Sequence, residues 1–440
     1  MLRLALVALA LLALPDAARD AAAQDAVAFE NVTVVPMDRE RTLPGHTVLV
    51  RGDRIEAVGP DGSIAVPAGA LRVDGAGRWL VPGLGEMHGH VPPPDAPAAL
   101  VEETLFLYLS QGVTTVRGML GHEGQLELRR RANAGGVLSP TLYLAGPSFN
   151  GTSVSSPEEA AAMVRRQAAE GWDYLKVHPG LTLAEYDALA DAAREVGLRF
   201  GGHVPAEVPL ARALRRGQDT FDHMDGYAET LGAAEGPVDP AALAALVDQT
   251  RASGGIIVPT MALWETLFGA VPLDTLRAYP ELAYVPDRQV EAWAAAVERR
   301  RASPDYDAEA VRRYVDGRNE VLAALHAGGV EILLGTDAPQ LFSVPGFSVH
   351  REVPRMTAAG MTPYEVLRSG TALVGAYFAG EDTFGLVAPG HRADLVLLDA
   401  DPLADAAHLR AVAGVMARGR WLDRADLDRR LDAIRAAHAR

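Results

Sequence analysis

The sequence predicts a mixed α/β fold: a TIM (β/α)8 barrel with a small β-sandwich domain built from both chain ends. Three observations support this prediction. Strand-like runs alternate with helical patterns through the middle of the chain, mostly in units of about 25–30 residues. Short β-like runs separated by turns occupy both ends. Several predicted barrel strands end in histidine, lysine or aspartate, at the position where barrels carry functional groups.

The first 23 residues are typical of a secretion signal. Arg3 precedes an unbroken apolar run at residues 4–14, and three alanines at 21–23 offer a cleavage site. The apolar run is too short to span a bilayer as a helix, so no membrane anchor is expected. We therefore expect a periplasmic or secreted protein.

The small domain is predicted from residues 24–84 and 379–422. Strand-like runs fall at 28–35, 47–51, 54–58 and 79–81, and again at 394–398 and 412–417, with turn signals such as Gly52-Asp53 and Pro389-Gly390 between them. Residues 423–440 are expected to close the chain with a helix over roughly 424–437.

The barrel is predicted over residues 85–378. Helical patterns lie at 157–170, 183–196, 205–216 and 240–252. The seventh unit carries a long, helical insertion at 273–328 that could cap the barrel mouth. The eight expected strands end near His90, Arg117, Ala145, His178, His203, His223, Pro259 and Asp337.

Composition narrows the classes of partner and of metal ligand. The net charge is −16 and no basic run exceeds three residues, so nucleic acid is not an expected partner. The chain has no cysteine, which excludes disulfides and thiolate ligands. Any metal must be held by histidine, aspartate, glutamate or a modified lysine.

Lys176 is the only lysine in the chain, although lysine and arginine together number 41. A desolvated lysine can become a neutral amine, which arginine cannot. A neutral amine can take up carbon dioxide and become an anionic carbamate. Drift toward arginine-rich codons explains why lysines are few, but not why this one lies in an apolar strand beside His178.

The predicted strand ends also gather metal-ligating residue types. His88 and His90 are two apart on a strand and therefore point to the same side. Taken singly, each such residue could be a packed core histidine or a helix cap. Taken together, so many buried polar groups need partners, and a metal would satisfy them. The residues at these ends are His88, His90, Lys176, His203, His223 and Asp337.

Four segments identify a family resemblance. They read VPGLGEMHGH (81–90), GVTTVR (112–117), LGTD (334–337) and GLVAPGHRADLVLLD (385–399). The chain resembles the amidohydrolase superfamily in its imidazolonepropionase-like and Xaa-Pro dipeptidase-like branch. It departs from that pattern at Glu86, where aspartate is usual, and at Gly118, where peptidase-like members often have aspartate.

The resemblance implies a binuclear metal site and its ligands. His88 and His90 would bind one divalent metal, and His203 and His223 the second. Lys176, carboxylated on its side-chain nitrogen, would bridge the two, and Asp337 would contact the first. Zinc is the default for such ligands, with manganese or cobalt as alternatives.

The activity that the resemblance implies is hydrolysis of amide or peptide bonds in small substrates such as dipeptides or N-acyl amino acids. A metal-bridging hydroxide would attack the carbonyl, and Asp337 would move the proton to the leaving amine. Arg117 is a candidate for a substrate carboxylate. His178, Tyr227 and His350 could orient the substrate or could instead pack. Whether the chain forms a homo-oligomer is left open.

Two other functions remain open. The chain could be a mononuclear deaminase or a cyclic-amide hydrolase. Deaminases of this fold carry His-x-x-Glu on the fifth strand, whereas Glu207 is four residues after His203 and Pro205 intervenes. The chain could also be a non-catalytic metal-binding barrel, although Asp337 argues against that.

Overall fold

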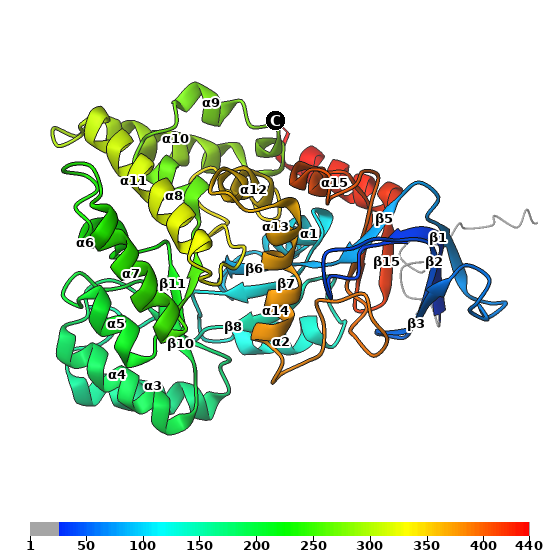
Figure 1. The fold of residues 1–440 in the computed structure, drawn as a ribbon, viewed down its shortest axis with the longest axis horizontal. Coiled ribbons are helices and arrows are strands. Elements are labelled where there is room, and N and C mark those ends of the chain that lie inside the picture. The colour runs from blue at the N-terminus through cyan, green and yellow to red at the C-terminus, as the bar shows by residue number, and fades with distance from the viewer. Residues whose placement is uncertain (1–25, 440) are drawn as a thin grey trace, which may run out of the picture.

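The computed structural model describes residues 26–439 and shows a mixed α/β fold, with a β-sheet at one end and a larger α/β part at the other (Figure 1). The predicted signal at 1–23 lies outside the described residues. Between residues 26 and 439, no helix is long and apolar enough to cross a membrane.

The small sheet combines strands from both chain ends, as the alternating runs predicted. Its eight strands pair in one sheet, in the order β15-β14-β13-β5-β1-β2-β3 with β4 on β1, and not in the two sheets of a sandwich. Inward-facing apolar residues form its core, where the Phe29 and Trp421 rings lie 5.0 Å apart. The strands are β1 (Ala26–Val34), β2 (Leu43–Arg51), β3 (Arg54–Pro60), β4 (Leu71–Asp74), β5 (Trp79–Pro82), β13 (Leu395–Leu398), β14 (Val412–Ala417) and β15 (Arg420–Asp423).

The central part carries seven parallel strands in two sheets, not the single closed barrel sheet that the sequence predicted. One sheet has the order β6-β7-β8 and the other β12-β11-β10-β9. These strands are short and buried along almost their whole length, although they mix apolar residues with polar ones such as Arg117, Lys176 and Asp222. They are β6 (Leu84–Gly89), β7 (Val113–Gly118), β8 (Thr141–Leu144), β9 (Leu175–Val177), β10 (Phe200–Gly202), β11 (Thr220–Asp222) and β12 (Ile256–Val258).

The eighth predicted strand, residues 332–337, is the main departure from a barrel. A single bridge pairs Ile332 with Ile257 of β12, and the Met87 N–H of β6 donates to the Leu334 carbonyl at 2.9 Å. Farther along, the Thr336 N–H donates to the Glu86 carboxylate at 2.7 Å instead of to a backbone carbonyl. At this edge, the Glu86 side chain therefore accepts a hydrogen bond that a backbone carbonyl would accept in a regular strand ladder.

Helices cover the outside of the parallel strands, and their ends follow recognisable caps. α3 (Pro157–Glu170) and α4 (Leu183–Val196) match the predicted ranges, with the Ser156 hydroxyl and a Thr182–Glu185 capping box at their starts. α5 (Leu210–Arg216) begins five residues later than predicted, because Pro205 and Pro209 lack N–H groups and favour extended backbone before them. The other covering helices are α1 (Ala98–Ser110), α2 (Gln125–Asn133), α7 (Pro240–Ser253), α13 (Pro363–Gly370) and α14 (Ala372–Tyr377).

The predicted insertion is helical. Its longest helix, α11 (Ala308–Ala327), packs against α6, α7 and α12, and α10 packs against α8 and α9. α15 (Arg424–His438) closes the chain, as predicted, and packs on α1 and β15. The remaining helices are α6 (Tyr227–Thr230), α8 (Met261–Leu267), α9 (Leu273–Arg277), α10 (Asp287–Arg301), α12 (Val349–Ala358), and the 3-10 helices η2 (Pro280–Tyr284) and η3 (Ala406–Arg410).

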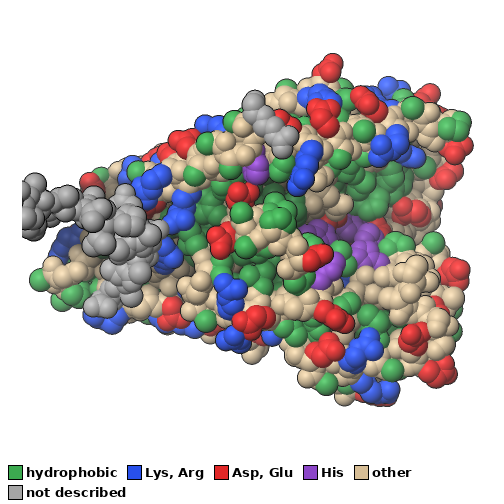
Figure 2. Space-filling view, turned by 180° about the vertical axis from the view of Figure 1, so that it is seen from behind, with side chains coloured by type: hydrophobic (Ala, Val, Ile, Leu, Met, Phe, Trp, Pro, Cys, Tyr) green, Lys and Arg blue, Asp and Glu red, His purple; other side chains and the backbone are tan. Residues whose placement is uncertain are grey.

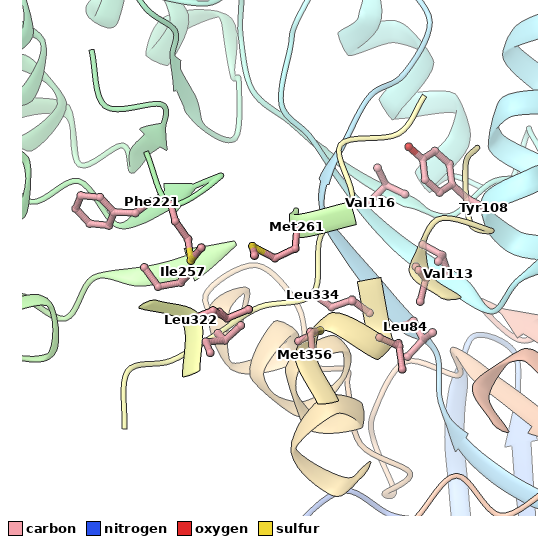
Figure 3. Close-up of a cluster of buried hydrophobic side chains, with 14 of the residues drawn as sticks. Leu84, Tyr108, Val113, Val116, Phe221, Ile257, Met261, Leu322, Leu334 and Met356 are labelled. Atoms are coloured by element: carbon pink, nitrogen blue, oxygen red, sulfur yellow. The ribbon is translucent and has the colours of Figure 1, made fainter. Parts of the chain in front are cut away.

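One large apolar core joins these strands and helices. Figure 3 shows Leu84, Val113 and Val116 from β6 and β7 beside Leu334, and Phe221 and Ile257 from β11 and β12. Met261, Leu322 and Met356 bring helices α8, α11 and α12 into the same cluster. Close packing on all sides fixes the strand ends, and therefore the directions of the polar side chains that follow them.

Candidate metal centre

Five of the six predicted ligand residues lie in parallel strands or directly after them, and Asp337 lies in the segment where the eighth strand was predicted. His88 is on β6 and Lys176 on β9, while His203 and His223 come directly after β10 and β11. Figure 2 shows histidine side chains gathered in a hollow, with hydrophobic surface beside them. We call His88, His90, Lys176, His203, His223 and Asp337 the histidine cluster.

Three members of the histidine cluster could hold one metal ion. One ligand atom from each of His88, His90 and Asp337 lies within 4.8 Å of the other two. The Asp337 Oδ1 atom lies 2.5 Å from His90 Nε2 and 3.5 Å from His88 Nε2. Two imidazoles and a carboxylate match the donor types that zinc takes in proteins.

Lys176 lies against this group and is fully buried. Its Nζ atom is 3.2 Å from His88 Nε2 and 3.9 Å from Asp222 Oδ2. Burial lowers the pKa of Lys176 to about 8, although the nearby carboxylates oppose the shift. The lowered pKa makes the neutral amine, the form that reacts with carbon dioxide, easier to reach than in an exposed lysine.

His203 and His223 form the other side of the cluster, with ring centroids 4.5 Å apart. His203 Nδ1 lies 2.6 Å from Asp225 Oδ2, and His223 Nδ1 lies 2.7 Å from Thr260 Oγ1. Partners at Nδ1 leave Nε2 of each ring for another ligand, which is the usual arrangement of metal-binding histidines.

His223 Nε2 is a buried nitrogen with no hydrogen-bond partner among residues 26–439. Across the cluster, Asp337 Oδ2 lies 3.8 Å from it. Burial holds the pKa of His223, like that of His88, well below its usual value. Both rings are therefore neutral, which is the state that binds a metal.

The backbone at the strand ends is held in an uncommon conformation. His223, Thr260 and Asp337 have φ angles of 63°, 46° and 62°, in the left-handed region that residues other than glycine rarely adopt. Such strain is retained where the surrounding structure imposes it, and it clusters at functional sites. Here it occurs just after β11 and β12 and in the segment that carries Asp337.

Two buried acidic residues, Asp222 and Glu86, contact the predicted metal ligand His88. Asp222 Oδ2 lies 2.7 Å from His88 Nδ1, within ion-pair distance. Glu86, the departure from the usual aspartate, accepts hydrogen bonds from the His88 N–H at 3.1 Å and from the Thr336 hydroxyl at 2.6 Å. Glu86 therefore ties the histidine strand to the segment that carries Asp337.

Arg117 does not support the predicted contact with a substrate carboxylate. Its side chain is 1% exposed, and its guanidinium donates to the Met87 carbonyl at 2.6 Å and to Asp222 at 3.3 Å. The remaining NH group donates to Thr220 Oγ1 and to the Tyr377 hydroxyl, both at 3.2 Å. Arg117 thus holds Asp222 inside the fold and has no free donor pair for a ligand.

The other predicted substrate residues separate into two groups. His178 lies beside the cluster, with its ring 5.1 Å from that of His203. Tyr227 is fully buried and pairs with Thr250 Oγ1 at 2.9 Å, and His350 Nε2 lies 3.1 Å from Gln111 Oε1. The geometry gives Tyr227 and His350 packing roles. Packing was the alternative to a substrate contact for each of them.

A cavity of about 520 Å³ opens over the cluster. It includes residues that the sequence did not single out, notably His122, Trp264 and Gln340. His122 follows β7 by only four residues, so its position after a strand end was the signal available in the sequence. The lining residues are His88, His90, Val91, Pro92, Pro93, Leu120, His122, His178, His203, Trp264, Leu267, Asp337, Pro339 and Gln340.

Comparison with solved structures supports the predicted resemblance. A bottromycin amidohydrolase superposes with a TM-score of 0.75 and 26% identity, covering 96% of this chain and 92% of that one. A putative prolidase from Bifidobacterium longum superposes with a TM-score of 0.70 and 25% identity, covering 93% and 99%.

Sequence comparison gives related proteins. The imidazolonepropionase of Cereibacter sphaeroides is 27% identical over 386 residues, which are 82% of this chain and 90% of that protein. Adenine deaminase 3 of Rhizobium meliloti is 25% identical over 374 residues, but the chain spans only 51% of its length.

A family model described as the amidohydrolase family matches residues 79–422, which is more than half of the chain. The matched range includes all six residues of the histidine cluster and the return of the chain to the small sheet. The chain therefore belongs to the amidohydrolase family, and this membership indicates a metal-dependent hydrolase acting on carbon–nitrogen bonds.

Proposed function

We propose that this protein is an exported, binuclear metal-dependent amidohydrolase that cleaves amide or peptide bonds of small substrates. The observation that carries the proposal is the histidine cluster: four imidazoles around one carboxylate, with His88 and His223 buried and an unpartnered nitrogen on His223. Export rests on the signal-like sequence of residues 1–23 alone.

The residues present fit two divalent metals, with zinc as the first candidate. His88 and His90 would hold one and His203 and His223 the other, with Asp337 on the first. Lys176, as a carbamate, would supply two oxygens between them, and its burial beside His88 suits that role. When bound, the metals would make hydroxide available near neutral pH and polarise the substrate carbonyl.

The chain's own groups would position the substrate and move the proton. Asp337 lines the cavity, and its carboxylate can accept a proton from the attacking water and pass it to the leaving amine. His178 also lines the cavity and can donate a hydrogen bond to the amide. Asp225 and Thr260 keep the Nε2 atoms of His203 and His223 directed into the cluster.

We also propose that the parallel strands follow the arrangement of an eight-unit barrel. One bridge joins Ala145, after β8, to Tyr174, before β9, and another joins Ile257 of β12 to Ile332. The two parallel sheets and the last segment are therefore neighbours in chain order. The Asp337 N–H donates to the His88 carbonyl at 2.6 Å and links the last segment to the first strand. These contacts support an eight-unit barrel as the plan of the fold.

A mononuclear deaminase or cyclic-amide hydrolase is the second candidate, favoured by the similarity to adenine deaminases and imidazolonepropionases. The described structure adds an argument against the deaminase. Glu207, the glutamate nearest to His203 on the fifth strand, is exposed and does not line the cavity. A non-catalytic metal-binding barrel is the third candidate and predicts bound metal without turnover.

Hydrolysis tests the proposal directly. The purified full chain would be loaded with zinc, manganese or cobalt and given a panel of amides, dipeptides, cyclic amides and aminopurines. We expect amide cleavage that a chelator abolishes and that metal restores. His203→Gln should lose this activity, whereas His326→Gln, at a remote histidine near Glu365, should keep it. Deamination or ring opening without amide cleavage would establish the second candidate, and no turnover would favour the third.

A further inference from the structure

We infer that the cavity selects substrates with an apolar group beside the scissile amide and no free carboxylate. This inference rests on the proposed function and narrows its substrate class. Dipeptides and N-acyl amino acids both carry a carboxylate, so they would be poor substrates. Capped peptides, arylamides and alkylamides would be good ones.

The first observation is the lack of a cation in the cavity wall. Among the lining residues that the structure describes, none is lysine or arginine. Arg117, the sequence's candidate for a carboxylate, is buried against Asp222 and does not line the cavity. A substrate carboxylate would therefore find no guanidinium or ammonium partner of the kind that usually binds it.

The second observation is the apolar character of the wall. Val91, Pro92 and Pro93 follow β6, and Leu120 follows β7. Trp264 and Leu267 of α8 also line the cavity. Figure 2 shows hydrophobic surface next to the exposed histidines. An ionised group moved from water to such a wall loses hydration without compensation, whereas an alkyl or aryl group gains from burial.

The polar part of the wall is suited to a neutral amide. His122, His178 and Gln340 offer imidazole and carboxamide groups, which can donate to a carbonyl or accept from an N–H. Asp337 is the only carboxylate in the described lining. The net charge of −16 also opposes the approach of anions.

One buried cation lies behind the wall. The Arg318 guanidinium is 5.2 Å from the centre of the Trp264 ring, and its NH1 group has no partner among the described residues. Arg318 is 1% exposed and does not line the cavity, whereas Trp264 does. A carboxylate would need to displace the indole to reach it. Arg318 therefore gives the clearest alternative to test.

The test uses substrate pairs that differ only in the carboxylate. N-acetyl-leucine is paired with N-(3-methylbutyl)acetamide, and glycyl-leucine with the 3-methylbutylamide of glycine. We expect kcat/KM to be at least about tenfold higher for the carboxylate-free member of each pair. Calorimetric titration of the metal-free protein with the acetyl pair should give the same order of affinity.

Substitution at Leu267 provides a matched gain of function. Leu267 is half-buried, so a longer polar side chain can extend from α8 into the cavity. Leu267→Arg should raise kcat/KM for the carboxylate members relative to Leu267→Gln, which adds polarity without charge. Circular dichroism would show that both variants are folded.

The outcomes separate the inference from the proposed function. Preference for the carboxylate members would overturn the inference while leaving the amidohydrolase standing, and loss of that preference in Arg318→Gln would assign the carboxylate to Arg318. If neither pair nor the wider panel is cleaved, the proposed function fails. The titration then still decides which ligand class the cavity binds.

Discussion

Two buried polar clusters lie next to each other in the central part, and they differ in how their atoms are satisfied. The first is the histidine cluster. The second, which we call the arginine cluster, is formed by Arg117, Tyr174, Asp219, Asp222 and Tyr377. In the arginine cluster, Arg117 contacts Asp222 and Tyr377, and both tyrosine hydroxyls donate to Asp219. None of its side-chain nitrogens or oxygens is without a hydrogen-bond partner among the described residues, whereas His223 Nε2 and His88 Nδ1 are.

This difference distinguishes a buried polar network that stabilises the fold from one that can bind a ligand. A fully satisfied buried network rigidifies the fold and offers nothing to a ligand. A buried polar atom without a partner is costly, so its retention needs another explanation, such as an ion. Both clusters contain charged residues, and they differ in the pairing of their atoms and in access to the cavity, which only the histidine cluster lines.

The largest expected effect is on catalysis at Asp337. Asparagine has nearly the same size and tolerates the left-handed backbone at this position, where φ is 62°. Asp337→Asn should therefore stay folded but lower kcat/KM by about 1,000-fold, because it cannot take up a proton. Steady-state kinetics on the best amide and a thermal melt measure the two effects. Retention of more than a tenth of the activity would remove Asp337 from proton transfer.

The arginine cluster should respond in stability instead. Arg117→Met leaves the Asp222 carboxylate buried without its cation, and loss of one partner of a buried ion pair costs about 3–5 kcal/mol. We expect that decrease in the free energy of unfolding by urea, with KM almost unchanged in the protein that remains folded. Arg165→Met, which breaks an exposed pair with Glu195, is the control and should cost about 1 kcal/mol or less. A large rise in KM for Arg117→Met would instead place Arg117 in substrate binding.

Lys176 contacts both clusters, and substitution tests whether its role is structural or that of a ligand. An arginine at this position would keep the charge and a methionine would keep the apolar stem, but neither Lys176→Arg nor Lys176→Met can form a carbamate. The Lys176 stem is tightly enclosed, since a Cβ on Gly202 would lie 2.7 Å from Lys176 Cδ, so the smaller methionine guards against misfolding. Both variants should lose activity by at least about 100-fold. Full activity in Lys176→Met would show that the amine only fills space.

The smallest effect concerns a satisfied acid outside both clusters. Glu352 accepts the N–H groups of Met261 at 2.8 Å and Ala262 at 2.9 Å, where α8 begins. Burial raises the pKa of Glu352 from 4.5 to about 7, so the folded chain binds this proton more tightly than the unfolded chain. Its stabilising contribution is complete below pH 4.5 and is lost as the pH rises through 7.

Glu352→Gln removes that titration. Urea unfolding at pH 5, 6, 7 and 8 should show wild-type stability falling relative to the variant, by about 1–3 kcal/mol in total. Parallel pH profiles of the two proteins would mean that the carboxyl is ionised in both states. The measurement shows whether a buried carboxylate that accepts backbone N–H groups affects only the stability of the fold. We expect the same of the arginine cluster.

The sequence was sufficient where local patterns decide the structure. The ranges of α3 and α4, the sheet built from both chain ends and the meeting of the six strand-end residues follow from periodicity, caps and strand direction. The eighth strand failed because the Glu86 carboxylate takes the Thr336 N–H that a strand ladder would use. No local pattern reveals that pairing across 250 residues.

Residue roles were harder to predict than residue positions. Arg117 lies at a strand end, as expected, but its partners Asp222 and Tyr377 are 105 and 260 residues away in the chain. Which side chains neutralise it depends on tertiary packing. Trp264 gave no signal because it belongs to α8, and only the packing of that helix brings the indole to within 5.4 Å of the His223 ring.

Metal content of the wild-type chain tests the central claim most directly. Inductively coupled plasma mass spectrometry of the reconstituted, desalted protein should give two divalent metal ions per chain. The folded Arg117→Met variant should give the same number, because the arginine cluster supplies no ligand. One ion per chain would contradict the binuclear centre, and none would contradict a metal role for the histidine cluster altogether.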